Sequence, residues 1–510
     1  MSVDLTLGGE LKLNEVLTYL QEGGRVQLHP GAREAMDRSR AMVASAVEEG
    51  RVVYGITTGF GKFSSVTIQK DDLEALQLNL IRSHACGVGR YLPGHLARTI
   101  VMLRAHALAQ GHSGVRPLLV ETLIQLANLN CHPAIPAFGS VGASGDLAPL
   151  AHLALVLVGE GSLIADNEVC PSIELMQKAG ISPLTLQPKE GLALINGTQV
   201  STAMALDNLN MSRRLFSWSQ AITALTLDAA RGSDGPTFAP IHQIRRQSGQ
   251  IQVASVLERL LRGSEIRHSH EQCPRVQDNY ALRCAPQVHG AVLDTLHHVS
   301  DILGREINAV TDNPLIFPEE GRMVSGGNFH AEPVALVCDF AAVAMAELGS
   351  IAERRVETLV NPQLSFLPPF LVEKEGLESG MMIPQVVAAS LVSANKSLAF
   401  PASVDSIPTS GGKEDHVSMA PHAAWKWRQI LKRLAWILAI ELLCAVKAVD
   451  FLRPLKSSEE LEGVVAMVKD RVGEWKGDTA LHSQIEEVAD MLRTTPPDTL
   501  CKGISGLLFR

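Results

Sequence analysis

Three consecutive small residues, Ala143-Ser144-Gly145, can build an electrophile out of the polypeptide backbone. If the chain turns tightly, the amide nitrogen of Gly145 can attack the carbonyl carbon of Ala143. Loss of water from that adduct and from the Ser144 side chain would leave a methylidene-imidazolone with an electron-poor alkene. Glycine permits the close approach because it has no Cβ. No ordinary side chain is an electrophile, so such a group would attack electron-rich substrates without an added cofactor.

The same residues also have a purely structural interpretation. They can form a loop in front of an apolar helix that starts at Leu147, with Ser144 or Asp146 as its N-cap. The longer string over residues 139–150, GSVGASGDLAPL, resembles the signature of the aromatic amino acid ammonia-lyases. This resemblance implies that Ala143-Ser144-Gly145 forms 4-methylidene-imidazole-5-one (MIO) autocatalytically, with no external cofactor and no metal.

Two further stretches resemble catalytic motifs of that family. Residues 54–61, YGITTGFG, resemble its tyrosine loop, which implies that Tyr54 is the base that removes the β-proton of an α-amino acid. A phenol can do this only where nearby donors or positive charge favour its ionised form. Asn196, in the stretch EGLALINGTQ, matches the asparagine that binds the imidazolone oxygen and increases its pull on electrons. Without the resemblance, a tyrosine packed beside a turn and a helix-capping asparagine would be the simpler interpretations.

Other matches fall on positions that hold the substrate. Arg283, in the stretch QDNYALRC, matches the arginine that grips the substrate carboxylate, and its planar guanidinium can pair with both oxygens. In the same stretch Tyr280 matches a catalytic position and Gln277 one that orients the substrate. Phe329, in SGGNFH, matches the aromatic residue beside the prosthetic group. The resemblance extends from roughly residue 50 to residue 420 and is weaker in the last eighty residues.

Members of this family differ in the side chain that they recognise. Ser83-His84 matches the selectivity position of the family. Histidine-specific members typically carry Ser-His there, phenylalanine-specific members Phe-Leu and tyrosine-specific members His-Leu. Glu414 can accept an imidazole N–H, but facing a phenyl ring it would be a buried, unpaired charge. Met382 matches a methionine that forms a soft wall for a flat ring. The expected reaction is therefore elimination of ammonia from L-histidine to give trans-urocanate, the first step of histidine degradation.

One departure from the family pattern leaves alternatives open. Before Glu414 the chain reads Ser410-Gly-Gly-Lys413, where the family more often has Ser-Ala-Asn-Gln. Two glycines favour a mobile loop, and Lys413 can pair with a carboxylate. The main alternative is a phenylalanine or tyrosine ammonia-lyase or aminomutase. A relative that eliminates the betaine group of a thiolated histidine is a minor alternative, and a non-catalytic structural homologue a distant one.

A second group of residues has metal-binding side chains at close spacing. His268, His270 and Cys273 lie within six positions of one another. Zinc would require a fourth ligand and partners that orient its ligands. We find no matching motif elsewhere in the sequence and expect no metal site there.

The composition is typical of a helical protein that buries part of its surface by subunit association. Of the 510 residues 46% are hydrophobic, but only 4% are aromatic and 19% charged, so Ala, Leu, Val and Ile must build the core. This mixture favours helices and subunit association. The net charge of −9 argues against nucleic acid or an anionic membrane as a partner. The sequence shows no secretory signal, and its eight cysteines are scattered without CxxC pairs, so we expect a cytoplasmic protein that acts on a small molecule.

Apolar residues recur every three or four positions in long stretches, which predicts helices. These stretches are 147–160, 199–227, 287–308, 333–361, 383–398 and 425–451. A capping box at Ser457-Ser-Glu-Glu460 predicts a further helix, and Val3–Leu7 and Val52–Ile56 are β-like.

From these elements we predict a mixed α/β domain over residues 1–110, with the Tyr54 loop and Ser83-His84. A long-helix domain over residues 111–510 would carry the tripeptide and most of the active site. The resemblance implies a predominantly α, fumarase/aspartase-like fold with a long central helix bundle. It also implies a homotetramer whose active sites each draw residues from three subunits.

Overall fold

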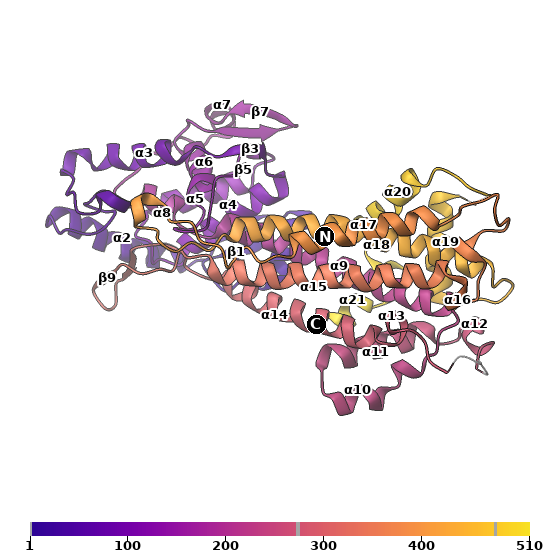
Figure 1. Ribbon diagram of the computed structural model, residues 1–510. Coiled ribbons are helices and arrows are strands. Elements are labelled where there is room, and N and C mark those ends of the chain that lie inside the picture. The colour runs from indigo at the N-terminus through magenta and orange to yellow at the C-terminus, as the bar shows by residue number, and fades with distance from the viewer. Residues whose placement is uncertain (1–2, 272–275, 474–476, 510) are drawn as a thin grey trace. The chain divides into compact units, whose positions relative to one another are not determined.

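The computed structural model describes residues 3–271, 276–473 and 477–509, and most of them are helical (Figure 1). Each of the six long stretches predicted to be helical coincides with a helix whose bounds differ from the predicted ones by at most five residues. These helices are α6 (Leu147–Leu157), α9 (Gln199–Ala229), α14 (Ala285–Glu306), α15 (Glu332–Val360), α17 (Met382–Leu398) and α18 (Ala420–Asp450). The predicted fold class, predominantly α with a smaller mixed part, is confirmed.

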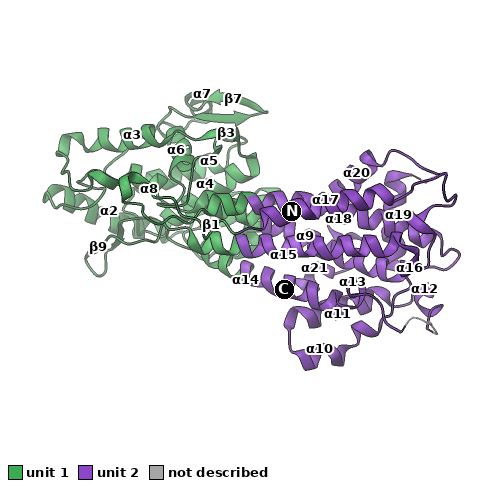
Figure 2. Ribbon diagram, in the orientation of Figure 1, with its two compact units in different colours: residues 1–207, 300–338, 401–425 green, residues 208–299, 339–400, 426–510 purple. Residues whose placement is uncertain are grey.

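The chain divides into two compact units (Figure 2). Unit 1 consists of residues 1–207, 300–338 and 401–425, and unit 2 of residues 208–299, 339–400 and 426–510. Because each unit is assembled from separated segments, the residues of α9, α14, α15 and α18 are shared out between the two. The predicted domains divide the chain once, at residue 110, whereas these units are built from several separated segments, so the predicted domain boundary stays a prediction.

Unit 1 holds every strand among the described residues, in four small sheets. β1 (Leu5–Leu7) pairs in parallel with β2 (Val26–Leu28), and β3 (Val88–Tyr91) is antiparallel to β5 (Pro136–Phe138). β4 (His132–Pro133), β6 (Ser162–Ala165) and β7 (Glu168–Pro171) form an antiparallel sheet in the order 4-6-7. β8 (Leu315–Phe317) and β9 (Arg322–Val324) form a hairpin. None of these sheets exceeds three strands, so they connect loop segments, and the helices provide the core.

One of the two predicted β-like pieces is correct and the other is wrong. Val3–Leu7 contains β1, but Val52–Ile56 forms no strand. The Thr57 hydroxyl accepts a hydrogen bond from the Val53 amide at 2.9 Å, and the Ile56 amide bonds back to the Val53 carbonyl. This local bonding competes with strand pairing and leaves a turn at Tyr54.

The remaining helices of unit 1 include a buried one, α4 (Gly94–Ala109). The others are α1 (Leu13–Glu22), α2 (Ala32–Glu48), α3 (Leu73–His84), α5 (Pro117–Ala127), α7 (Ser172–Lys178) and α8 (Glu190–Ile195), with short 3-10 turns η1 (Gly61–Phe63), η2 (Lys70–Asp72) and η5 (Ser410–Gly412). Helices α1, α2 and α5 pack against α4. α4 is buried along almost its whole length, including its polar residues Arg104 and His106. A helix without a solvent-facing side can present polar groups only to the interior, so those groups need partners there.

In unit 2 a buried polar network links four long helices. Arg355 of α15 pairs with Glu441 of α18 at 2.5 Å, and both side chains are fully buried. Thr226 of α9 donates to the same carboxylate, and His289 of α14 accepts from Arg355. Burial, reinforced by Arg355, holds the pKa of His289 well below its ordinary value, so this ring stays neutral and can accept.

The other elements of unit 2 are short. They are α10 (Ala239–Arg245), α11 (Ser248–Leu261), α12 (Glu265–His268), α13 (Tyr280–Arg283), α16 (Pro362–Ser365), α19 (Glu459–Val472), α20 (His482–Thr494) and α21 (Ile504–Leu508), with η3 (Gly235–Thr237), η4 (Pro369–Leu371) and η6 (Pro497–Thr499). The predicted helix after the capping box is α19, and Ser458 is its N-cap because its side chain accepts from the Leu461 amide. The neighbouring Ser457 instead donates to Asp228.

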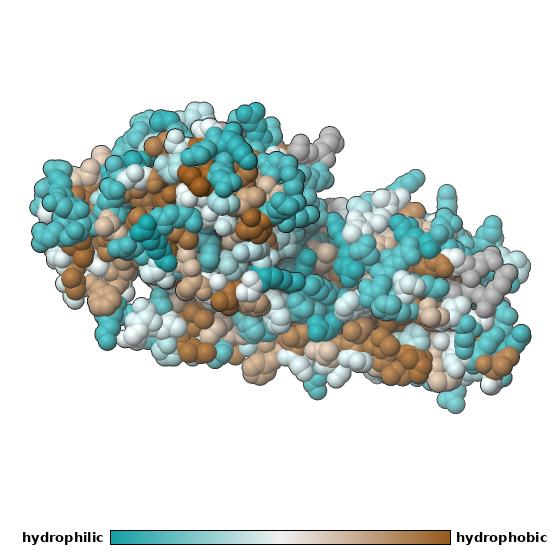
Figure 3. All heavy atoms as spheres, turned by 90° about the horizontal axis from the view of Figure 1, so that it is seen from above, coloured by the Kyte–Doolittle hydropathy of each residue, from teal (hydrophilic) through white to brown (hydrophobic). Residues whose placement is uncertain are grey.

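Among the described residues, α15 alone is long and apolar enough to cross a membrane, but 67% of its most apolar stretch is buried inside the protein. That burial is what a core helix of a bundle requires. On the face seen in Figure 3, hydrophobic side chains form patches among hydrophilic ones. Exposed hydrophobic side chains of unit 2 include Phe340, Val343, Ile383, Val386 and Phe400.

Candidate active site

An open cavity of about 1260 Å³ in unit 1 brings together most of the residues singled out in the sequence. The predicted residues that line it are Tyr54, Ser83, His84, Ala143, Ser144, Asn196, Phe329 and Glu414. They come from separate segments of the chain, so only folding makes them neighbours. Gly145 follows directly in the same loop and is buried.

The loop that carries the tripeptide is pressed against the turn after α8. Gly145 has a φ of +73°, and a Cβ at this position would lie 2.3 Å from the carbonyl oxygen of Gly197. The next amide, that of Asp146, donates to the same carbonyl at 2.7 Å. Only glycine fits at residue 145, both for its left-handed backbone and for lack of space.

Asp146 ties this loop to the first turn of α9. It holds the N-cap position of α6, as the structural interpretation allows, but its side chain makes no capping bond. Its fully buried carboxylate instead accepts from the amide and hydroxyl of Ser201, both at 2.8 Å, and from Ser140. Burial raises the pKa of Asp146, and these hydrogen bonds oppose that shift.

Asn196 places an amide donor on the tripeptide. It follows α8 directly, is 3% exposed, and its Nδ2 donates to the carbonyl oxygen of Ser144 at 2.7 Å. This carbonyl lies within the segment that would form the imidazolone ring. A donor placed there stabilises negative charge on that oxygen.

Glu414 approaches the tripeptide from the segment before α18. Its Oε1 accepts from the Ser144 hydroxyl at 2.7 Å, and its Oε2 accepts from the Thr409 hydroxyl at 2.6 Å. Thr409 and Glu414 also pair through their backbones, with the Thr409 amide 2.9 Å from the Glu414 carbonyl. The glycines at 411 and 412 both have positive φ and form the tip of this closed loop. Glu414 is therefore held in place despite the two glycines.

Tyr54 and His84 face the same cavity with defined hydrogen bonds. The Tyr54 hydroxyl accepts from the Gly61 amide at 3.3 Å. His84 ends α3, and its Nδ1 lies 2.8 Å from the Leu80 carbonyl, which can only accept, so Nδ1 carries the proton in this contact. In the neutral ring Nε2 is then an acceptor available to a ligand.

Four predicted site residues do not line this cavity. Gln277, Tyr280 and Arg283 lie in and before α13, and Met382 begins α17, all in unit 2. The Arg283 guanidinium lies 4.5 Å from the centre of the Tyr280 ring, which is 70% exposed. Their assignment to the site stays a prediction.

Several lining residues were not singled out from the sequence. His330 follows Phe329 within the quoted motif SGGNFH, and Asp415 and His416 directly follow the predicted residue Glu414, so their positions in the sequence are the signal for them. Lys62 follows the tyrosine loop, and with Lys413 it brings positive charge to the cavity. Asn313 also lines it, and nothing in its sequence context indicates this.

One set of side chains in the described part of the chain has the chemistry of a metal site. Potential ligand atoms of His330, Glu332 and His416 lie within 4.8 Å of one another. Of the group weighed in the sequence, Cys273 lies outside the described residues, and His268 bonds to Glu271 at 2.9 Å on the surface.

Comparison with known proteins gives a consistent result. A family model described as aromatic amino acid lyase matches residues 11–470. The histidine ammonia-lyase of Caldanaerobacter subterraneus subsp. tengcongensis is 49% identical over 487 residues, which are 96% of each chain. The crystal structure of histidine ammonia-lyase from Trypanosoma cruzi has a TM-score of 0.89 at 38% identity, covering 98% of this chain and 95% of that one. Tyrosine aminomutase from Streptomyces globisporus has a TM-score of 0.90 at 36% identity over 97% of each chain, so the fold by itself does not select the reaction.

The contact between Gly145 and Gly197 leads to a stability prediction. We expect Gly145→Ala to lower Tm clearly more than Gly180→Ala does, as measured by differential scanning calorimetry. Gly180 has nearly the same φ, +72°, but no atom lies within 4 Å of the place that a methyl group would take there. Both variants carry the backbone strain of about 1 kcal/mol or more, and only Gly145→Ala adds the clash. Equal losses of Tm would contradict the close packing of this loop.

Proposed function

Since this chain belongs to the aromatic amino acid lyase family, we propose that it eliminates ammonia from L-histidine to give trans-urocanate. The observation that carries this proposal is the cavity in which Ser144, Asn196, His84 and Glu414 meet. Lyases and aminomutases share this fold, so the polar groups that face the substrate must decide which side chain is accepted.

The tripeptide fits the formation of MIO. The left-handed turn at Gly145 leaves no room for a Cβ, and Asn196 already binds the Ser144 carbonyl. Once formed, the group supplies an electrophilic alkene that makes the amine of the substrate a better leaving group. Its atoms all come from Ala143-Ser144-Gly145, so the proposal needs no external cofactor.

Tyr54 is the proposed base. Tyr54 lines the cavity, and its hydroxyl oxygen accepts the Gly61 amide hydrogen, a contact that favours negative charge on that oxygen. The β-proton of the substrate would pass to this oxygen. Asn196 holds the Ser144 carbonyl, and Phe329 supplies an aromatic wall.

Glu414 and His84 are the proposed selectivity residues. Thr409 holds Oε2 of Glu414, which leaves Oε1 to accept an imidazole N–H once the Ser144 hydroxyl is gone. His84 offers Nε2 from the end of α3, beside Ser83. A phenyl ring in this place would satisfy neither group, and the uncompensated desolvation of a carboxylate costs several kcal/mol.

We propose that Gln277, Tyr280, Arg283 and Met382 complete the site from neighbouring subunits of a homotetramer. The exposed Tyr280 and the exposed hydrophobic side chains of unit 2, among them Phe340 and Val386, support such association. A single-chain mass in sedimentation equilibrium would contradict it.

None of the seven cysteines in the described part of the chain is in a disulfide, which supports a reducing, cytoplasmic location.

Product analysis tests the proposed reaction directly. Purified protein given L-histidine, L-phenylalanine or L-tyrosine should release urocanate fastest, with cinnamate and coumarate read alongside by absorbance. Ser144→Ala should fold but retain less than about a hundredth of the activity, because the ring can form only if a hydroxyl leaves. Faster turnover of phenylalanine or tyrosine than of histidine would refute the proposed substrate, and substantial activity in Ser144→Ala would refute ring formation at this residue.

Replacing the proposed base should affect the chemical step. Tyr54→Phe keeps the ring but removes the hydroxyl, and we expect kcat for histidine to fall about 100-fold or more with little change in KM. Tyr91→Phe is the matched control, because Tyr91 is exposed and does not line the cavity. A change confined to KM would instead assign Tyr54 to substrate positioning.

Removing the charge of Glu414 should weaken selection for imidazole. Glu414→Gln keeps an acceptor for Thr409, so the loop should remain closed, and we expect histidine turnover to fall about 100-fold. Combined with Ser83→Phe and His84→Leu, it should allow detectable cinnamate formation. Glu319→Gln, an exposed residue outside the cavity, is the control. Unchanged discrimination between histidine and phenylalanine would exclude Glu414 as a selectivity residue.

A further inference from the structure

The turn that joins α8 to α9 makes two of the contacts that hold the tripeptide loop. Asn196 donates to the Ser144 carbonyl, and the Gly197 carbonyl accepts from the Asp146 amide at 2.7 Å. A shift of this turn would move the Asn196 amide away from the oxygen that it holds. The site therefore depends on whatever keeps this turn in place.

Arg104, on the buried helix α4, binds the chain on both sides of the turn. Its Nη2 donates to the Ala193 carbonyl in α8, and its Nη1 donates to the side-chain oxygen of Gln199 at 2.9 Å and the Thr311 carbonyl at 3.3 Å. A Cβ on Gly197 would lie 2.3 Å from the same Nη1, so the turn is packed directly against the guanidinium.

The geometry of this contact requires arginine. The planar guanidinium binds one acceptor before the turn, the Ala193 carbonyl, and one after it, the Gln199 side chain. These two bonds restrict the angle at which α9 follows α8. Gln199 is held in turn, because its Nε2 donates to the Thr311 hydroxyl at 2.7 Å. Arg104 is fully buried, and burial lowers its pKa to about 10, so it keeps its charge and all its donors at neutral pH.

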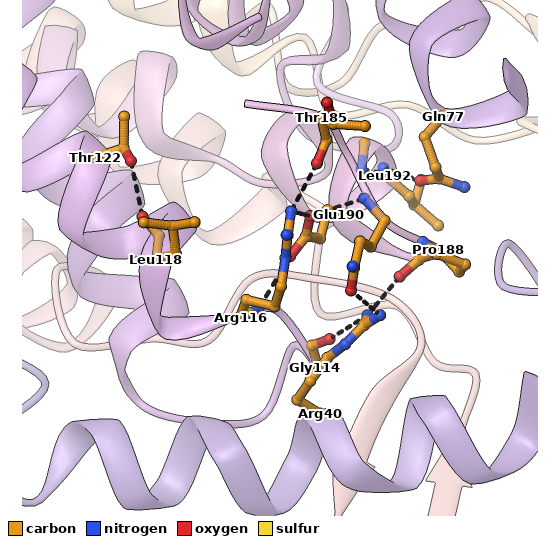
Figure 4. A network of polar contacts seen from close by, with 12 residues as sticks. Arg40, Gln77, Gly114, Arg116, Leu118, Thr122, Thr185, Pro188, Glu190 and Leu192 are labelled. Carbon is orange, nitrogen blue, oxygen red and sulfur yellow. Dashed lines mark hydrogen bonds and ion pairs between the residues drawn. The ribbon is translucent and has the colours of Figure 1, made fainter. Parts of the chain in front are cut away.

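The beginning of α8 is fixed by different residues (Figure 4). The buried carboxylate of Glu190 accepts from Arg116 at 2.8 and 2.7 Å, and the Gln77 side-chain oxygen accepts from the Gly191 amide. Arg40 donates to the Pro188 carbonyl just before the helix. None of these contacts reaches the end of α8, where Arg104 binds the Ala193 carbonyl; after the turn, Thr198 donates to Glu306.

We propose that Arg104 is a positioning residue that fixes the Asn196 amide on the Ser144 carbonyl. This inference rests on the proposed function for its effect on turnover, but not for its effect on the turn itself. Lysine in place of Arg104 carries its donors on one nitrogen, so it lacks the planar fork whose two nitrogens reach Gln199 and Ala193 separately.

A double-mutant cycle tests whether Arg104 acts through Asn196. We expect Arg104→Lys to lower kcat for histidine about tenfold or more with little change in KM. In an Asn196→Ala background the same substitution should change kcat by less than about twofold. Arg116→Lys, at the other end of α8, is the matched control: it should lower Tm and leave kcat within about twofold. If the double variant loses kcat by the product of the two single-variant factors, the residues act independently and the proposal is overturned.

Two readouts do not depend on turnover. Arg104→Lys should speed amide hydrogen exchange at residues 195–198 and shift the near-ultraviolet absorbance of the prosthetic group, whereas Arg116→Lys should do neither. Unchanged exchange and absorbance in Arg104→Lys would overturn the positioning role. If the intact mass of the wild-type protein shows that no water has been lost from the chain, the proposed function is overturned. The exchange comparison would still decide the role of Arg104. If Arg104→Lys does not fold, Gln199→Met, which removes one of its acceptors, provides the same comparison.

Discussion

The hydrogen bond from Asn196 to the carbonyl of Ser144 is the contact on which the arrangement of the site depends. It joins the end of α8 to a loop whose next residue, Gly145, has no space for a side chain. The donor and the loop can therefore not move independently. A preorganised donor is effective because it needs no rearrangement when charge develops on its acceptor.

Burying polar groups around that contact is costly unless each finds a partner. Asp146 accepts from Ser140 and Ser201, and Glu190 is paired with Arg116. Lys189, which precedes α8, pairs with Asp312 at 2.7 Å, and both side chains are buried. The bonds from Ser201, Arg116 and Lys189 join segments that are distant in the sequence: Ser201 ties the tripeptide loop to α9, and the pairs of Glu190 and Lys189 hold the beginning of α8. Rigidity at the site follows from the need to satisfy these groups.

The scaffold and the selectivity of the site are separate properties. Proteins named for reactions with histidine and with tyrosine have the same fold as this chain. The proposed selectivity residues, His84 and Glu414, are each held by a hydrogen bond, His84 to the Leu80 carbonyl and Oε2 of Glu414 to the Thr409 hydroxyl. A small number of oriented polar atoms can discriminate between rings of similar size because an unmatched one loses its partner without compensation.

From the sequence, local periodicity predicted the six long helices, and the family resemblance, carried by short motifs, indicated eight residues that line the cavity, Ala143 and Ser144 of the tripeptide among them. The prediction of a strand was wrong at Val52–Ile56, where a threonine side chain replaced strand bonding by a turn. The assignment of Gln277, Tyr280, Arg283 and Met382 to the site, which they do not line within one chain, stays a prediction. Only the tertiary structure singled out Arg104, since in the sequence it is one of several polar residues in a largely apolar helix. Its acceptors at residues 193, 199 and 311 become neighbours only when the chain has folded, and no local pattern records a contact of that kind.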